Sequence, residues 1–162
     1  ELMAKGLLCS KEVAKEKLRK IVYDGLKKYF KRIKCYDNVP ETFEKFKNAG
    51  FKLALLSDFP PEQKGEIWGV KKYCDVVLGT EQLGALKPDA YSFLEMAKML
   101  NVEPSKILYV GNSKKYDVAG SHNAGMKCAY LVPFRKRLFK KFIKEPEICF
   151  SNYRQLQDIV LQ

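Results

Sequence analysis

Short apolar runs alternate along the chain with longer stretches in which apolar residues recur every three or four positions. The short runs are rich in Val, Ile, Leu and Tyr, which is typical of buried strands. They predict strands over residues 51–57, 74–78, 107–110, 128–132 and 148–150. The helical spacing predicts helices over residues 10–33, 40–48, 90–100, about 116–125 and 153–161.

This alternation of strand and helix predicts right-handed βαβ units, in which consecutive strands run parallel. Because the strand segments are mostly apolar, helices should cover both faces of the sheet. We therefore expect a three-layer α/β fold, a doubly wound parallel sheet with a Rossmann-like core, preceded by a long amphipathic helix.

Polar residues stand where two predicted strands end. Ser57 and Asp58 close the 51–57 strand, and Asn112 and Ser113 follow the 107–110 strand. Asp117 comes shortly afterwards and is the only acid between residues 107 and 126. The carboxyl ends of parallel strands, next to helix N-termini, are where open α/β sheets bind anions. The alternatives are purely structural: a local turn at Ser57 and a helix cap at Asp117.

A length of 162 residues suits one domain with a sizeable core. No run approaches the roughly 20 apolar residues of a membrane span, and we expect no signal peptide or membrane partner. The five cysteines are scattered without a C-x-x-C pair, so we expect neither a disulfide framework nor a zinc site. Together these features predict a cytoplasmic protein.

The net charge of +11 is concentrated in two places, residues 11–34 with +7 and residues 134–144 with +6. Such patches suit nucleic acid or an anionic surface. However, these basic residues are interspersed with apolar ones at helical spacing, which favours a solvated amphipathic face over a nucleic-acid site.

Three segments, taken together, resemble the motifs of the haloacid dehalogenase-like (HAD) superfamily. An apolar strand that ends in Ser or Thr matches 55–57, and a Lys-Pro-Asp before a helix matches 87–89. The pattern Gly-Asp-Ser, then Asp, then Gly-Ala-x-x-Ala-Gly-Met matches 111–113, Asp117 and 120–126. The likeness runs from about residue 36 to the C-terminus. It implies a partial helical cap over 1–35 and a HAD-like core domain over 36–162.

The resemblance implies a hydrolase that attacks its substrate with an Asp carboxylate and forms a covalent aspartyl intermediate. A Mg²⁺-dependent phosphatase for a small phosphate monoester is the leading expectation. The implied substrate-binding residues are Ser57, Asp58 and Lys87, with the Ser57 hydroxyl holding phosphoryl oxygens and the Lys87 ammonium offsetting their charge. Lys87 and Asp117 are the implied catalytic residues, and Asn112 and Asp117 the implied Mg²⁺ ligands.

The superfamily's first motif, Asp-x-Asp-Gly-Thr after an apolar strand, is absent from this sequence. Asp24-Gly25 is the nearest imitation, but it follows basic residues at helical spacing, so we expect Asp24 to be a surface residue of a helix. In the family this strand lies between those that end at Ser57 and Gly111. Without it, both neighbours would keep unpaired backbone groups. We therefore expect a segment upstream of Glu1 to supply the strand and the nucleophile.

Asn112 stands where the family usually has Asp, and a neutral amide binds Mg²⁺ more weakly than a carboxylate does. Two alternatives therefore stay open. One is a metal-independent dehalogenase, and the other is a non-catalytic HAD-like protein whose basic face binds an acidic protein partner. His122, the only histidine, is expected on an exposed helix face without a catalytic role.

Overall fold

The structure is a computed structural model that describes residues 6, 9–30, 32–61, 68–133 and 145–162. It divides into two compact units, Glu1–Lys34 and Cys35–Gln162. The basic run 134–144 lies outside the described residues. Within the described residues, no helix is long and apolar enough to cross a membrane.

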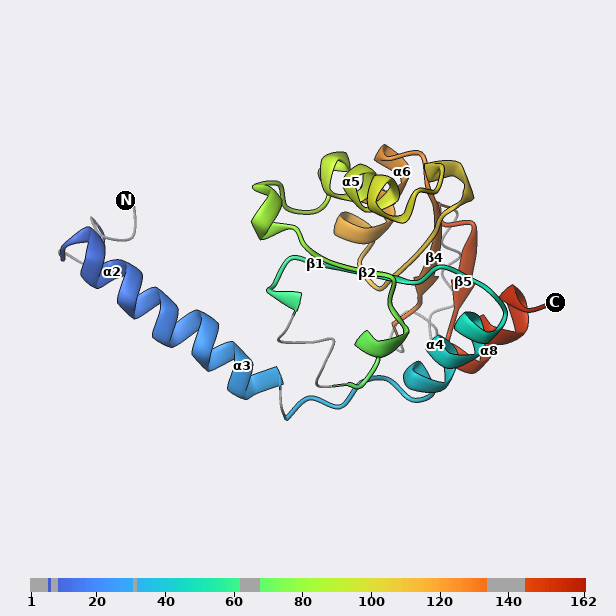
Figure 1. Cartoon of the computed structure of the whole chain (residues 1–162), viewed down its shortest axis with the longest axis horizontal. Helices are drawn as coiled ribbons and strands as arrows, with labels where there is room; N and C mark the ends of the chain where they lie inside the picture. The colour runs from blue at the N-terminus through green and yellow to red at the C-terminus, as the bar shows by residue number, and fades with distance from the viewer. Residues whose placement is uncertain (1–5, 7–8, 31, 62–67, 134–144) are drawn as a thin grey trace. The chain divides into compact units, whose positions relative to one another are not determined.

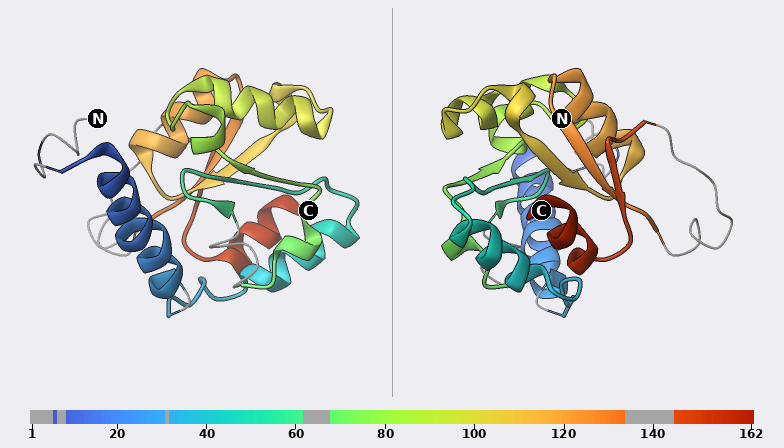
Figure 2. Two further views of the ribbon diagram at one scale, coloured as in Figure 1. Left: turned by 60° about the vertical axis from the view of Figure 1, so that its left-hand side comes forward. Right: turned by 90° about the vertical axis from the view of Figure 1, so that its right-hand side faces the viewer.

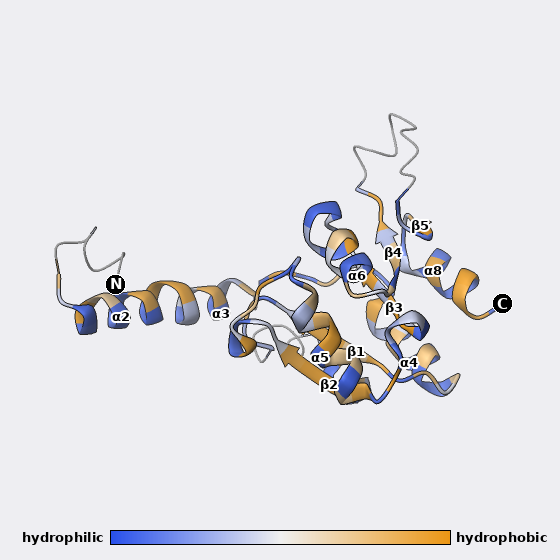
Figure 3. Cartoon of the chain, turned by 90° about the horizontal axis from the view of Figure 1, so that it is seen from above, coloured by the Kyte–Doolittle hydropathy of each residue, from blue (hydrophilic) through white to orange (hydrophobic). Residues whose placement is uncertain are grey.

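In its described residues, the first unit contains a helical rod that passes through α2 (Lys11–Leu18), the π-helical segment η1 (Arg19–Asp24) and α3 (Gly25–Phe30). The Ser10 hydroxyl caps it by accepting a hydrogen bond from the Val13 N–H at 3.3 Å. Apolar and polar residues alternate around the rod (Figure 3). Asp24 is exposed and helical, as predicted. Gly25 keeps helical dihedral angles, so it marks the end of the π segment and not a break in the rod.

The described part of the second unit contains five strands: β1 (Ala54–Ser57), β2 (Val76–Gly79), β3 (Leu108–Gly111), β4 (Lys127–Leu131) and β5 (Ile148–Phe150). Their pairs β1–β2, β3–β4 and β4–β5 are all parallel, as the alternation predicts. The first strand begins three residues later than expected. Its predecessor Leu53 exchanges hydrogen bonds with Asp75, through the Asp75 carboxylate and backbone N–H, both at 2.7 Å.

Helices cover both faces of these strands (Figures 1 and 2). On one face lie α5 (Ala90–Leu100), the π-helical turn η6 (Lys114–Val118) and α6 (Ala119–Asn123). On the other lie α4 (Val39–Asn48) and α8 (Tyr153–Val160). The first face buries Phe93, Ala97, Ala124 and Met126, and the second buries Ala129, Leu131, Phe150 and Leu156. The architecture is therefore the predicted three-layer α/β sandwich.

The strands of the described ranges form two hydrogen-bonded groups, β1–β2 and β3–β4–β5. Leu56 of β1 and Tyr109 of β3 nevertheless pack against the same buried cluster beneath α5 and α6. Among the described residues, β1 pairs only with β2, and β3 only with β4. Each of these two strands therefore has one open edge.

Candidate functional site

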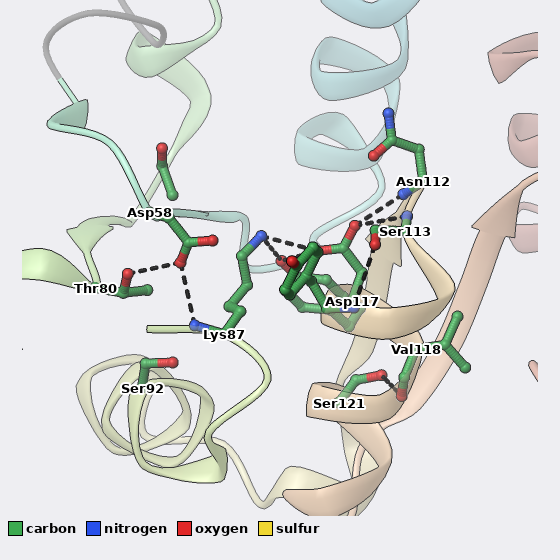
Figure 4. A network of polar contacts seen from close by, with 12 residues as sticks. Asp58, Thr80, Lys87, Ser92, Asn112, Ser113, Asp117, Val118 and Ser121 are labelled. Carbon is green, nitrogen blue, oxygen red and sulfur yellow. Dashed lines mark hydrogen bonds and ion pairs between the residues drawn. The ribbon is translucent and has the colours of Figure 1, made fainter. Parts of the chain in front are cut away.

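The structure brings Lys87 and Asp117 together, although thirty positions separate them in the chain. Lys87 lies in the loop before α5, and Asp117 lies in η6, just after β3. The Lys87 Nζ and the Asp117 Oδ1 are 2.8 Å apart, with side-chain exposures of only 12% and 7% (Figure 4). This buried ion pair is the centre of the candidate site.

Backbone N–H groups just after β3 bind the Asp117 carboxylate. The Asp117 Oδ2 accepts hydrogen bonds from the N–H groups of Asn112 at 3.0 Å and Ser113 at 2.9 Å. The Ser113 hydroxyl in turn caps η6 by accepting from the Tyr116 N–H at 3.2 Å. A Cβ on Gly111 would lie 2.6 Å from the Asp117 Cγ, so this close approach requires glycine.

Asp58 holds the Lys87 loop in place. Its Oδ1 accepts hydrogen bonds from the Thr80 hydroxyl at 2.7 Å and the Lys87 backbone N–H at 3.3 Å (Figure 4). Thr80 is fully buried, and its own N–H donates to the Ser57 carbonyl at 2.9 Å. One carboxylate therefore ties together the end of β1, the end of β2 and the loop that carries Lys87.

In the described part of the chain, the side chains of Ser57 and Asn112, unlike the carboxylates of Asp58 and Asp117, do not bind Lys87. Ser57 is buried at the end of β1, and its Oγ accepts from the Phe59 N–H at 3.1 Å, which is the local turn left open by the sequence. Among the described residues, it does not hydrogen-bond to Lys87 or Asp117. The exposed Asn112 side chain points away from the ion pair, and its Nδ2 donates to the Tyr36 hydroxyl at 3.4 Å (Figure 4).

The described residues do not form a Mg²⁺ site by themselves. Both Asp117 oxygens already accept hydrogen bonds, and Asn112 offers only a neutral amide oxygen. No group of three His, Cys, Asp or Glu side chains in the described ranges is placed to hold a metal ion. Mg²⁺ prefers carboxylate and water oxygens in octahedral geometry. The assignment of Asn112 and Asp117 as its ligands therefore stays a prediction.

Sequence reasoning missed Tyr109, which was interpreted only as part of an apolar strand. Its hydroxyl is 3.3 Å from both the Lys87 Nζ and the Asp117 Oδ1. Burial raises the pKa of Tyr109 well above its usual range, and the negative charge of Asp117 adds to this effect. The hydroxyl therefore stays protonated and donates to Asp117. The sequence feature that could have identified Tyr109 is its hydroxyl group, which is the one polar side-chain group in the otherwise aliphatic stretch 107–110.

His122 is half-buried in α6, and in the described part of the chain it forms no hydrogen bond with a candidate site residue. Its Nε2 lies 3.1 Å from the Glu147 Oε2, which also accepts from the Cys128 N–H at 2.7 Å. The side chain therefore links α6 to the residue before β5, and its surroundings are less exposed than predicted.

The haloacid dehalogenase-like hydrolase family matches residues 4–131. The chain belongs to this family. The match covers the helical rod and the strands through β4, and it confirms the family expected from the motifs at the strand ends.

Two curated relatives are phosphatases. The phosphoglycolate phosphatase of Aquifex aeolicus is 30% identical over 126 residues, covering 73% of this chain and 59% of the relative. The glyceraldehyde 3-phosphate phosphatase of Methanopyrus kandleri is 32% identical over 100 residues, covering 60% of this chain and 43% of the relative. The chain thus spans between about two-fifths and three-fifths of the length of these two proteins.

Solved structures confirm the fold. The HAD phosphatase of Thermococcus onnurineus has a TM-score of 0.74 at 24% identity, covering 98% of this chain and 84% of the other. The 2-haloacid dehalogenase of Pseudomonas syringae has a TM-score of 0.69 at 24% identity, covering 80% and 54%. Because phosphatases and dehalogenases share this fold, the fold alone does not choose between the two reactions.

Proposed function

We propose that this chain belongs to a Mg²⁺-dependent phosphatase that hydrolyses a small phosphate monoester through an aspartyl-phosphate intermediate. The observation that carries the proposal is the buried Lys87–Asp117 pair at 2.8 Å, located after β3 in a chain of the HAD family. The names of the relatives suggest the class of substrate, which includes phosphoglycolate and glyceraldehyde 3-phosphate.

The charge of the site supports a requirement for a divalent cation. Among the described residues, Asp58 and Asp117 are the acids that accept hydrogen bonds from Lys87, so these three side chains carry one formal negative charge in excess. Two unit charges 4 Å apart interact by about 4 kcal/mol at an effective dielectric constant of 20. A phosphate dianion would be repelled by this cluster. When bound, Mg²⁺ would supply the missing positive charge.

The nucleophile is proposed to come from a segment upstream of residue 1. The open edges of β1 and β3 support this proposal, because a parallel strand placed between them would satisfy their backbone groups. Such a strand would end beside Lys87, where the ammonium can contact a phosphoryl oxygen and the Ser57 hydroxyl can donate to another. Asp117 would hold Lys87 and the backbone of Asn112 in place.

The test is hydrolysis of p-nitrophenyl phosphate, phosphoglycolate and glyceraldehyde 3-phosphate by the complete gene product, with Mg²⁺ and with EDTA. We expect Mg²⁺-dependent turnover that falls by at least about 100-fold in Lys87→Ala. Lys98→Ala removes an exposed lysine of α5 and should leave turnover unchanged. The absence of turnover on all three substrates, with Mg²⁺ present, would contradict the proposal.

A metal-independent dehalogenase is the second candidate. It is favoured by the neutral Asn112 and by an Asp117 carboxylate whose two oxygens are already occupied. Halide release from a 2-haloacid in the presence of EDTA, without phosphatase activity, would establish this alternative.

A further inference from the structure

The Tyr109 hydroxyl closes a three-membered ring of hydrogen bonds with the buried ion pair. The Lys87 Nζ donates to the Asp117 Oδ1 at 2.8 Å and to the Tyr109 hydroxyl at 3.3 Å. The hydroxyl donates its own proton to the same Asp117 oxygen at 3.3 Å. Each member therefore restrains the other two.

The Tyr109 ring is held from behind by packing. Its centroid lies 4.9 Å from that of Phe93, with the ring planes at 60°, and Phe93 is fully buried. A Cβ on Gly120 would overlap the Phe93 ring and would lie 3.2 Å from the Pro88 Cα. The absence of that atom lets α5 and α6 approach closely and sets the position of Phe93, and through it that of Tyr109.

We propose that Tyr109 is a positioning residue for Lys87, one that fixes the direction of its ammonium. A lysine ammonium has three N–H donors. Among the described residues, Asp117 and Tyr109 accept two of them. With two donors fixed, tetrahedral geometry determines where the third points, and no rotation about the Cε–Nζ bond remains. Without the hydroxyl, the bond to Asp117 is the one hydrogen bond from the ammonium that remains among the described residues.

The effect of this positioning on catalysis rests on the proposed function, because in a phosphatase the third N–H of Lys87 would contact a phosphoryl oxygen of the substrate. The positioning itself can be measured without any turnover. Tyr109→Phe removes only the hydroxyl and keeps the ring against Phe93. Tyr130→Phe is the matched control, since Tyr130 is a buried tyrosine of the neighbouring strand β4 whose hydroxyl bonds neither Lys87 nor Asp117 among the described residues.

The experiment is ¹H–¹⁵N NMR of the lysine ammonium groups in the complete protein, labelled with ¹⁵N-lysine, at mildly acidic pH. The Lys87 signal is assigned by its loss in Lys87→Arg. We expect a resolved Lys87 signal in the wild type and in Tyr130→Phe. In Tyr109→Phe, its protons should exchange about tenfold faster, as the loss of one hydrogen bond of about 1.4 kcal/mol implies.

An unchanged Lys87 signal in a folded Tyr109→Phe variant overturns the proposal, and so does the lack of a resolved signal in the wild type. If the amide spectrum shows that Tyr109→Phe is unfolded, Phe93→Leu serves instead. It keeps the hydroxyl but loosens the ring, so faster exchange at Lys87 is again expected, and unchanged exchange counts against the proposal.

Two additional measurements separate this inference from the proposed function. Inorganic phosphate with Mg²⁺, added to the complete protein, should shift the Lys87 signal; no shift contradicts the phosphatase and leaves the exchange result for Tyr109 intact. In an active enzyme, Tyr109→Phe should lower kcat about tenfold while KM changes little, because the ammonium is misdirected and not removed. Equal kcat values would contradict a positioning role in catalysis.

Discussion

The ends of β1 and β3 both hold Lys87, but they hold different parts of it. At the end of β1, Asp58 binds the Lys87 backbone and the Thr80 hydroxyl, and so positions the loop. At the end of β3, Asp117 binds the Lys87 ammonium and the backbone N–H groups of Asn112 and Ser113. Asp58 therefore fixes the position of the Lys87 backbone, and Asp117 fixes the position of the Lys87 ammonium group.

Asp58 and Asp117 each follow an apolar strand in the sequence, yet they have separate roles in the structure. Asp58 was predicted to bind substrate, yet its Oδ1 makes two contacts within the protein. Asp117 is almost fully buried and compensates a buried cation. We expect changes at the β3 end to cost stability and charge balance, and changes at the β1 end to cost mainly loop order.

The largest effect is expected for Asp117→Ala. This change leaves a buried ammonium and two backbone N–H groups without their acceptor, so the free energy of unfolding should fall by about 3–5 kcal/mol. Urea denaturation followed by circular dichroism measures it. Asp158→Ala, at an exposed position of α8, is the control and should change little. A loss below 1 kcal/mol for Asp117→Ala would show that the pair does not stabilise the β3 end.

The next effect is expected for Gly111→Ala at the end of β3. The new methyl group would overlap the Asp117 side chain and displace its carboxylate, lowering the free energy of unfolding by about 1–3 kcal/mol. Gly50→Ala provides a comparison, because a Cβ there meets no neighbouring atom and only its positive φ of 84° causes strain. Thermal unfolding should show the larger loss at Gly111 if steric overlap dominates.

At the end of β1, Asp58→Asn and Asp58→Ala should separate geometry from charge. The Asn variant keeps an acceptor for the Thr80 hydroxyl and the Lys87 N–H, so its stability should change by less than about 1 kcal/mol. The Ala variant leaves both donors unsatisfied and should lose about 1–3 kcal/mol. In an active phosphatase, Asp58→Asn should also lower KM, because it removes a negative charge near the phosphate. If Asp58→Asn lowers the free energy of unfolding as much as Asp58→Ala does, Asp58 does not act as a hydrogen-bond acceptor that holds the Lys87 loop.

The smallest effect is expected on stability at alkaline pH, where one cysteine thiol near each group of strands loses its proton. Burial raises the pKa of Cys128 in β4, and that of Cys74 before β2, from 9.0 to about 11. Since the folded state favours the neutral thiol, stability is full below pH 9 and falls as the pH rises towards 11. Melting curves from pH 8 to 11 should fall less steeply for Cys128→Ala than for the wild type. If the melting temperature falls equally with pH in Cys128→Ala and in the wild type, the Cys128 thiol has the same pKa in the folded and unfolded states.

The order of elements was predictable because it depends on local periodicity. Strand and helix positions were correct to within a few residues. Ser57 and Asp117 became candidates because the ends of parallel strands converge, and Lys87 because it stands in a Lys-Pro-Asp motif before a helix; their roles stay predictions. The start of β1 was misplaced because Leu53 bonds the side chain and backbone of Asp75, a partner that is distant in the chain. The π-helical turns η1 and η6 have no signature in the apolar spacing.

The fold class, the family and the set of polar residues at the strand ends follow from the sequence alone, since each of these depends on residue types and short spacings. Which of these polar residues contact one another depends on the tertiary structure. It paired Lys87 with Asp117, turned the Asn112 side chain away from that pair, gave Asp58 an internal partner and brought in Tyr109. The physical reason is that side-chain direction at a strand end depends on packing across the layers, such as Phe93 against Tyr109 and Gly120, which no local pattern encodes.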